Sequence, residues 1–421
     1  MVAVLFIVFL VALAIGVPVA FSLGLASVAY MLGSHIQMIN FAQYFFKGLD
    51  SFTLLCIPGF TFAGNLMNQG GISDKLLDFA DALVGHVTGG LAYANVLASM
   101  VFAGISGTAL SDTVALGGVE IPMMVNQGYD VPFSVAITAA SSCLGPIIPP
   151  SVPMIMAATM TGLSVSKMFM AGIIPGLLMG LGLIVAALFV GRKANLTVQP
   201  KASGKERLKA FKDAFWGLLM PVIILGGIYG SIFTPTEAAA VSVFYGLIVG
   251  VFIYREINWK KMKDILIDSC STTATVMFIT MGATLFGYVL TRARLDLAIE
   301  NFMLTVTNGN TVIFFIIVNV VLLIAGCFLD STSALYIFTP LFAPVAVQLG
   351  IDPIHLGTVM IVNLAIGLFT PPVGVNLYVA CGIGDIKIEE ITKGIVPCLI
   401  AELAVLLLIT YVPAISTFLI H

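Results

Sequence analysis

Two short polar clusters interrupt apolar stretches of the sequence, and their residue types could bind ions. One is the segment 104–112, GISGTALSD, and the other is the segment 330–333, DSTS. Serine and threonine hydroxyls, with backbone carbonyls left unpaired where a helix stops, suit a hard cation such as sodium. Where a helix resumes, its free amides and positive dipole end suit an anion. We expect each cluster to form the tip of a re-entrant helical hairpin.

A proline-rich break lies downstream of each cluster. The breaks are GPIIPP at 145–150 and GLFTPP at 367–372, and each cuts an apolar segment. Two consecutive prolines remove amide donors and cannot continue a helix from the preceding turn. The apolar lengths on either side are only about 12–18 residues, where a full crossing needs about 20. This favours helices broken inside a membrane over loops that join ordinary helices.

The segments that contain these breaks are expected to be membrane helices, because the composition is very apolar. Of 421 residues, 59% are hydrophobic and 9% are charged, whereas soluble domains carry about 25% charged residues. Apolar stretches of 17 or more residues recur along the chain, each long enough to cross a bilayer as a helix. We therefore predict an all-α polytopic membrane protein. The stretch 2–31 is too long for a signal peptide and lacks a basic leader, so we expect it to remain as the first crossing.

The sequence repeats itself at an offset of 222 residues. Over 103–175 the ungapped comparison gives 15 identities, where roughly five are expected from so apolar a composition. They fall on residues that shape the backbone, such as Gly104 with Gly326, Pro122 with Pro344, Asp130 with Asp352, and the two Pro-Pro pairs. We predict two related halves, 1–191 and 214–421, joined by a cytoplasmic basic loop at 192–213.

Basic segments set the expected orientation. Segments 192–213 and 255–264 hold 11 of the 18 lysines and arginines, and short basic loops stay cytoplasmic. Two apolar segments, 214–232 and 235–254, lie between them, so the chain leaves and returns to the same side. The second opens with Thr234-Pro235-Thr236-Glu237, which we interpret as a capping box rather than as a functional role for Glu237.

Counting crossings predicts that the two halves are inverted. We place them at 2–31, 52–68, a hairpin at about 88–127, a broken helix at 131–162, 168–191, 214–232, 235–254, 269–290, a hairpin at about 311–349, a broken helix at 354–383, and 393–418. Five crossings separate each element from its mate, and an odd number inverts it. The amino terminus is then cytoplasmic, the carboxyl terminus periplasmic, and the first hairpin opens inward and the second outward. Inside loops hold 14 basic residues against 4 outside.

Inverted repeats with interrupted helices are typical of secondary transporters, and no Walker A motif points to nucleotide hydrolysis. Together with the runs SGTA at 106–109 and FTPTEAA at 233–239, these features resemble the large membrane subunit of tripartite ATP-independent periplasmic (TRAP) transporters over essentially the whole chain. The resemblance implies sodium-coupled uptake of an organic acid, often a dicarboxylate or sialic acid, across the bacterial inner membrane. It also implies a periplasmic binding protein, a small four-helix membrane subunit and an elevator motion of the hairpin-bearing domain. Sodium, in two or more copies, is the only cofactor expected, and no nucleic-acid partner is expected.

The resemblance also assigns ligands. It implies a first sodium site at Ser106, Thr108, Gly145, Ile148 and Pro150, and the repeat places a second at Phe328, Asp330, Gly367, Thr370 and Pro372. The substrate is expected between the two tips, near Pro149, Ser331, Thr332 and Asn376. Asp330 stands where the first half has Thr108. An ionised carboxylate at membrane depth is expensive, so we expect it to pair with a cation; the alternative is that it caps the helix after it.

Two other functions remain open. A self-sufficient sodium–dicarboxylate carrier of related architecture would work without a binding protein, and a neighbouring binding-protein gene would separate the two. The pair Tyr129-Asp130 and the run GIGD at 382–385 match elements of intramembrane aspartyl proteases. Asp130, however, fits a helix cap, Asp385 runs into an interfacial stretch, and the Pro-Ala-Leu motif is missing. The six cysteines stand singly, as small buried hydrophobes do, and the four histidines form no HExxH motif.

Overall fold

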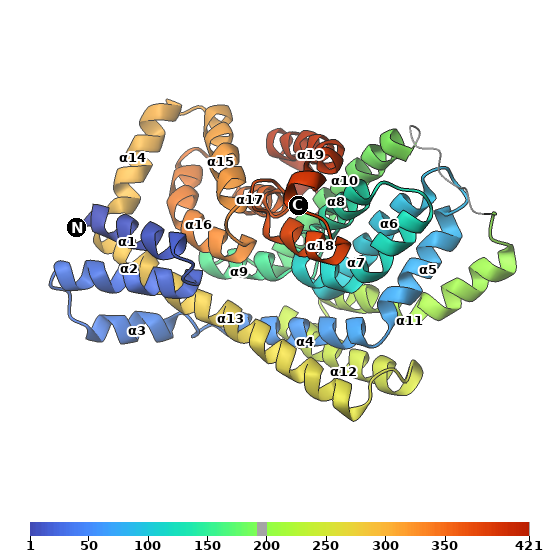
Figure 1. The fold of residues 1–421 in the computed structure, drawn as a ribbon. Helices are drawn as coiled ribbons and strands as arrows, with labels where there is room; N and C mark the ends of the chain where they lie inside the picture. Colours follow the sequence, from blue (N-terminus) through green and yellow to red (C-terminus); the bar gives the residue numbers. More distant parts are fainter. Residues whose placement is uncertain (192–199, 421) are drawn as a thin grey trace.

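A computed structural model describes residues 1–191 and 200–420, and it is helical throughout, without a strand in those ranges (Figure 1). The predicted all-α class is confirmed. Five helices of the described chain are long and apolar enough to cross a membrane: α10 (Val165–Gly191), α11 (Gly204–Tyr229), α12 (Pro235–Leu247) with its π-helical continuation η2 (Ile248–Ile253), α13 (Trp259–Arg292) and α19 (Ile388–Tyr411).

Shorter helices make up the rest of each half. In the first half these are α1 (Val2–Ala14), α2 (Val19–Gly33), α3 (Ile39–Lys47), η1 (Phe52–Leu55), α4 (Cys56–Gln69), α5 (Ile72–Val84), α6 (Gly90–Ser106), α7 (Ala109–Asn126), α8 (Val131–Ser142) and α9 (Val152–Thr161). In the second half they are α14 (Leu295–Thr307), α15 (Thr311–Gly326), α16 (Ser331–Gln348), α17 (Pro353–Gly367), α18 (Val375–Gly384) and α20 (Ala414–Thr417).

The helix bounds repeat along the chain. Helices α7 and α16 begin and end at positions that differ by 222 residues at both ends. The series α5, α6, α7, α8, α9, α10 is matched in order by α14, α15, α16, α17, α18, α19. The packing is also reciprocal: α7 contacts α18, and α16 contacts α9, while α2 contacts α13, and α4 contacts α12. At the same offset α2 corresponds to α12 with η2, and α4 to α13. Each of these contacts therefore occurs a second time between the corresponding helices.

Both predicted polar clusters fall between consecutive helices. In the first half, Gly107 and Thr108 separate α6 from α7, and Gly107 has a φ of +69°, a backbone conformation that glycine adopts without strain. In the second half, residues 327–330 separate α15 from α16. The proline breaks separate α8 from α9 and α17 from α18. Local sequence thus ends the helices at the expected places.

The amino-terminal stretch differs from the prediction. Residues 2–31 are not one crossing but two helices, α1 and α2, which pack on each other and are separated at Gly16, where φ is +84°. Pro18 is the residue immediately before α2, and a proline is well tolerated at the start of a helix. The predicted cytoplasmic amino terminus depended on a single crossing here, so the structure removes the basis for that placement. Helices α3, α5 and α14 were also missed.

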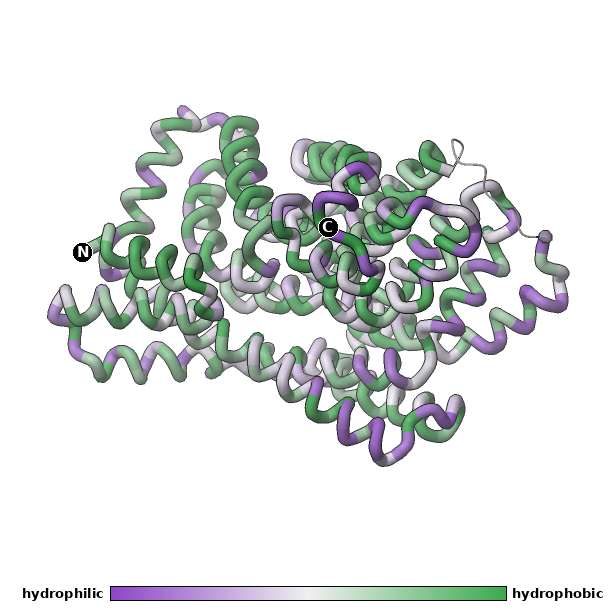
Figure 2. The backbone as a smooth tube through the Cα atoms, viewed as in Figure 1, coloured by the Kyte–Doolittle hydropathy of each residue, from purple (hydrophilic) through white to green (hydrophobic). Residues whose placement is uncertain are grey.

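The basic segments are more helical than expected. Helix α11 begins at Gly204 and α13 at Trp259, so much of both predicted loops is helix; residues 192–199 lie outside the described chain. Figure 2 shows hydrophilic residues gathered at the beginnings of α11 and α13, away from the apolar bulk of the helices. The predicted capping box is confirmed, because Thr234 Oγ1 accepts from the Glu237 amide at 3.3 Å and the Thr234 amide donates to Glu237 Oε2 at 2.8 Å. Cys270 is exposed, contrary to prediction, whereas the other five cysteines are buried.

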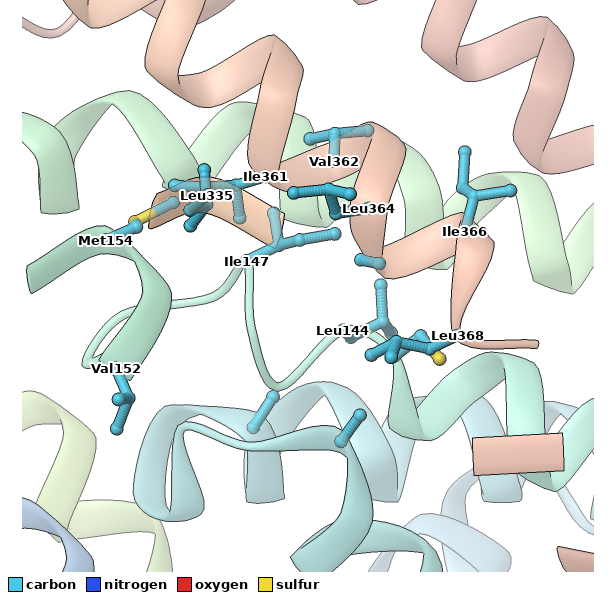
Figure 3. Packing of buried hydrophobic residues seen from close by; sticks show 14 of the residues in the cluster. Leu144, Ile147, Val152, Met154, Leu335, Ile361, Val362, Leu364, Ile366 and Leu368 are labelled. Atoms are coloured by element: carbon cyan, nitrogen blue, oxygen red, sulfur yellow. The ribbon is translucent and has the colours of Figure 1, made fainter. Parts of the chain in front are cut away.

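One buried apolar cluster joins the two halves behind the breaks. Figure 3 shows Leu144 and Ile147, from the break between α8 and α9, in the same packed group as Leu335 of α16 and Leu364 of α17. Leu144, Ile147, Leu335 and Leu364 are each at most 1% exposed. Contacts with the second half therefore hold the first break in place, in addition to its few local backbone hydrogen bonds, such as the Ile148 amide to the Leu144 carbonyl at 2.8 Å.

Candidate functional site

A cavity of about 750 Å³ lies where the two polar clusters meet α4 and α13. The α6–α7 turn contributes Ser106 and Thr108, and the α15–α16 turn contributes Asp330, Ser331 and Thr332. Tertiary structure thus brings both predicted tips to one cavity. Pockets for small organic ligands have volumes of about 300–1,000 Å³, so a small organic molecule fits.

Three helices begin at this cavity. Lining residues include Ala109 in the first turn of α7, Val152 in the first turn of α9, and Ser331 at the start of α16. A helix N-terminus has unsatisfied amides and about half a positive charge. Among the described residues, no lysine or arginine lines the cavity, so the helix ends supply its positive potential. The arrangement suits a small anion such as a carboxylate.

Ser331 has free hydrogen-bonding capacity at the cavity wall. It is 4% exposed, and its Oγ has no hydrogen-bond partner within the described chain. A buried hydroxyl without a partner costs about 1–3 kcal/mol, and a ligand in the cavity could recover that cost. This observation agrees with the predicted position of Ser331 beside the substrate.

A polar wall on α4 and α13 faces the tips, and sequence reasoning missed it. The Asn65 amide donates to Ser269 Oγ at 2.8 Å, and the Gln69 amide donates to Asp268 Oδ2 at 3.4 Å, which ties the two helices together. The sequence held a signal, because polar residues recur at three- and four-residue spacing within these apolar segments. The wall residues that line the cavity are Thr61, Asn65, Asn68, Gln69, Asp268, Ser271, Thr272 and Thr275.

The first tip is closely packed around backbone groups. Helix α6 ends at Ser106, and the following Gly107 lies against the break, where an added Cβ would stand 2.6 Å from the carbonyl oxygen of Pro150. Gly145 lies against Thr108, where an added Cβ would stand 3.0 Å from the Thr108 carbonyl oxygen. The structure therefore brings Ser106, Thr108, Gly145 and Pro150 together, as the resemblance implied.

Unpaired carbonyls at this tip fit a sodium ion. Within the described chain, the carbonyl oxygens of Gly145, Ile148 and Pro150 accept no hydrogen bond. Helices α6 and α8 both end at this point, and the carbonyl end of a helix carries partial negative charge. Unwound carbonyls and helix C-terminal ends are the groups that coordinate sodium in broken-helix transporters. The donor set is thus of the right chemical type.

The second tip is more open and its aspartate is engaged. Asp330 Oδ2 accepts from the Ser333 amide at 3.1 Å, and Oδ1 accepts from the Ser333 hydroxyl, so the side chain caps α16. The capping alternative for Asp330 is therefore present in the structure. Phe328 is 57% exposed. Gly367 lies tightly against Gly326, where an added Cβ would be 2.5 Å from the Gly326 Cα.

Hydrogen bonds occupy part of the second ligand set. The Gly367 carbonyl accepts from the Thr370 amide at 3.0 Å, and the Thr370 hydroxyl donates to the Ile366 carbonyl at 2.7 Å. Pro372 is exposed, whereas its repeat mate Pro150 is buried. The two predicted cation sites therefore differ. The residues of the first set are buried or half-buried and keep three free carbonyls, whereas hydrogen bonds engage part of the second set.

Two predicted substrate residues do not line the cavity. Asn376 is fully buried: its Nδ2 donates to the Ala139 carbonyl at 2.8 Å, and its Oδ1 accepts from Thr113 Oγ1 at 2.7 Å. Its amide is thus used to hold α18 against α7 and α8. Pro149, with Ile148, lines a separate apolar cavity of about 320 Å³ beside α5, α6 and α10. The chain turns within the break, so these side chains face away from the tips.

The carboxylates of the protease hypothesis are ordinary helix-end residues. Asp130 precedes α8 but makes no side-chain cap hydrogen bond, contrary to the predicted cap, whereas Asp352 Oδ1 accepts from the Ile354 amide at 2.7 Å. Asp130 and Asp385 are both exposed. The fully or almost fully buried carboxylates are instead Asp112 and Glu120 of α7 and Glu402 of α19. Asp112 ends the first polar cluster, but the sequence assigned no role to any of the three.

Comparisons with known proteins agree with the architecture. The family model described as "Tripartite ATP-independent periplasmic transporter, DctM component" matches residues 6–415. The chain is 41% identical to the sialic acid TRAP transporter large permease protein SiaM of Vibrio cholerae over 94% of this chain and 93% of that one. It is 41% identical to the C4-dicarboxylate TRAP transporter large permease protein DctM of the same organism, over 99% and 97%. It is 42% identical to the isethionate TRAP transporter permease protein DctMQ of Oleidesulfovibrio alaskensis, over 99% of this chain and 66% of that longer protein.

Two solved structures share the fold at low sequence identity. The Alcanivorax borkumensis YdaH transporter aligns with a TM-score of 0.57 at 16% identity, covering 87% of this chain and 88% of that one. Neisseria gonorrhoeae MtrF aligns with a TM-score of 0.59 at 13% identity, covering 90% and 85%. At this identity the likeness concerns the fold alone, and it places the chain among architectures used by membrane transporters.

Proposed function

The chain belongs to the DctM family of tripartite ATP-independent periplasmic transporters, and from this we propose that it is the large permease subunit of a sodium-coupled importer of a small organic anion. The relatives are permeases, a class of transport proteins rather than enzymes, so the protease interpretation falls. The substrate classes suggested by the relatives' names are C4-dicarboxylate, sialic acid and isethionate. All three carry a carboxylate or sulfonate group.

The cavity at the two tips carries this proposal. Three helix N-termini, the free Ser331 hydroxyl and the polar wall of α4 and α13 surround one space of about 750 Å³. Its ionisable lining residues among the described ones are Asp268 and Asp330, both acidic. An anion would be repelled by these carboxylates unless cations bind with it. The charge of the site and its free carbonyls therefore both support the proposal that sodium binds with the substrate.

Two sodium sites are proposed. The first uses the carbonyls of Gly145, Ile148 and Pro150 with Ser106 and Thr108. The second, related by the repeat, uses Phe328, Asp330, Gly367, Thr370 and Pro372. Sodium would neutralise negative charge at the cavity and hold the breaks in a binding-competent geometry. Since the first set is more buried than the second and three of its carbonyls are free, we expect it to dominate sodium affinity in this conformation.

Transport requires the cavity to reach both sides of the bacterial inner membrane. We propose that the halves are inverted relative to the membrane, which the matched helix order and reciprocal packing support. The hairpin-bearing helices α6–α9 and α15–α18 would then move as an elevator against α4 and α13. The proposed partners are a small four-helix membrane subunit and a periplasmic binding protein that delivers the substrate. The DctMQ relative, which is longer than this chain, fits a fused arrangement of the two membrane subunits.

Reconstitution tests this function. The chain, its small membrane partner and a candidate binding protein would be placed in proteoliposomes, and uptake of labelled dicarboxylate, sialic acid or isethionate would be measured with an inward sodium or potassium gradient. We expect uptake only with sodium and the binding protein. Ser331→Ala should reduce uptake, while Thr305→Ala, at an exposed position of α14, should not. Uptake that needs no binding protein would support the self-sufficient carrier, and uptake that ignores sodium would refute the coupling.

A further inference from the structure

Asp112 has a buried carboxylate, and within the described chain only one of its two oxygens accepts a hydrogen bond. It lies in the first turn of α7 and is 0% exposed. Its Oδ1 accepts from the Ser106 hydroxyl, whereas its Oδ2 has no hydrogen-bond partner within the described chain. Buried carboxylates are normally paired with a cation or with several donors. One serine hydroxyl does not meet that requirement.

The free oxygen lies beside Gly145, in the closely packed first tip. A Cβ added to Gly145 would stand 2.8 Å from Asp112 Oδ2 and 3.0 Å from the Thr108 carbonyl oxygen. The two oxygens therefore converge on the same spot beside Gly145, where the chain has no side chain. The unpaired Gly145 carbonyl belongs to the same residue. The first tip thus places the unpaired Asp112 oxygen beside two backbone oxygens. The Gly145 carbonyl is free of hydrogen bonds within the described chain, and the Thr108 carbonyl accepts only long ones, from the Asp112 amide and the Ser106 hydroxyl, each at 3.4 Å.

We propose that Asp112 is an anionic ligand of the first cation site, binding sodium through Oδ2. This inference rests on the proposed sodium coupling and adds to it the residue that balances the ion's charge. A cation at this tip lies near the N-terminus of α7, whose dipole end is positive and unfavourable to it. A carboxylate in the first turn of α7 offsets that repulsion. Carbonyl and hydroxyl ligands alone are neutral and cannot.

The second tip shows why Asp112, and not Asp330, has this role. The repeat mate of Asp112 is Ala334, and the repeat mate of Asp330 is Thr108, so each tip carries one carboxylate at a different position. Both oxygens of Asp330 are engaged with Ser333. Asp112 has the same kind of bond to a serine of its own tip but retains a free oxygen. The carboxylate with a free oxygen is thus at the first tip, whereas the sequence drew attention to the carboxylate of the second tip.

Sodium-dependent stability tests the assignment without relying on transport. Thermal unfolding of the purified complex would be followed at increasing sodium, with ionic strength held constant by potassium. Asp112→Asn keeps the size and the bond to Ser106 but removes the charge, and should raise the sodium concentration for half-maximal stabilisation by about tenfold or more. Asp330→Asn, whose amide can still cap α16, should raise it by a smaller factor. Equal effects of the two variants would overturn the assignment.

A labelling experiment on the wild-type chain covers the case in which Asp112→Asn does not fold. A hydrophobic carbodiimide modifies buried carboxyl groups, and mass spectrometry locates the adducts. Sodium should protect Asp112 but not Glu402, which is also fully buried and without a partner in the described chain. Equal labelling of both with and without sodium would overturn the role of Asp112. If sodium stabilises wild type and Asp112→Asn equally, only this inference fails. If sodium does not stabilise wild type, the proposed coupling fails with it.

Discussion

Replacing Gly107 by alanine should disturb the first tip, whereas the same replacement at the matched glycine Gly162 should not. Gly107 and Gly162 are both C-caps with a φ of +69°. An L-residue in this left-handed region costs about 1–2 kcal/mol. At Gly162 nothing lies within 4 Å of the added Cβ, so this strain is the whole expected cost. At Gly107 the Cβ would stand 2.6 Å from the Pro150 carbonyl oxygen, and such overpacking adds about 1–3 kcal/mol.

The assay is the free energy of unfolding in mixed micelles, measured for wild type, Gly107→Ala and Gly162→Ala by titration with a denaturing detergent. We expect Gly107→Ala to lose about 1–3 kcal/mol more than Gly162→Ala. Since relief of the contact must push the Pro150 carbonyl away, Gly107→Ala should also lose sodium-dependent stabilisation, whereas Gly162→Ala should keep it. Equal losses in the two variants would show that the approach of Gly107 to Pro150 does not constrain the tip, and the reasoning would be refuted.

Three further outcomes follow from the structure. Thr234→Ala should lower the free energy of unfolding by about 1 kcal/mol through loss of the cap on α12, with transport per folded molecule unchanged; a large loss of uptake at normal stability would contradict a purely structural role. Asn376→Ala should destabilise by about 1–3 kcal/mol, because buried partners are left unpaired, and substrate affinity measured on the folded fraction should stay at the wild-type value if Asn376 is not a substrate ligand. Single cysteines at Lys201 and Lys260, in a Cys270→Ser background, should react with an impermeant thiol reagent from the same face of oriented vesicles, and labelling from opposite faces would refute the proposed topology.

The sequence determined where helices stop. Local features end or begin these helices: the positive φ of Gly107, the proline breaks, and the capping box of Thr234 and Glu237. Each involves residues within a few positions of each other, so each can be predicted from a short stretch of sequence. The repeat was visible for the same reason, because its identities fall on residues that shape the backbone. Helix lengths were less accurate. Residues 2–31 are apolar throughout, and hydropathy cannot show that Gly16 divides them into two helices that pack on each other.

Only the tertiary structure decided which side chains share the site. The wall of α4 and α13, the free oxygen of Asp112 and the inward-turned amide of Asn376 each depend on which face of a helix meets which neighbour. In an apolar membrane helix that face has a weak sequence signature, since lipid and protein interior are both hydrophobic. A polar residue in such a segment can therefore line a cavity, bind a cation or bridge two helices. Asp112 and Asp330 stand within one turn of similar tips, and the position of a single serine relative to each decides that one caps a helix while the other keeps an oxygen free.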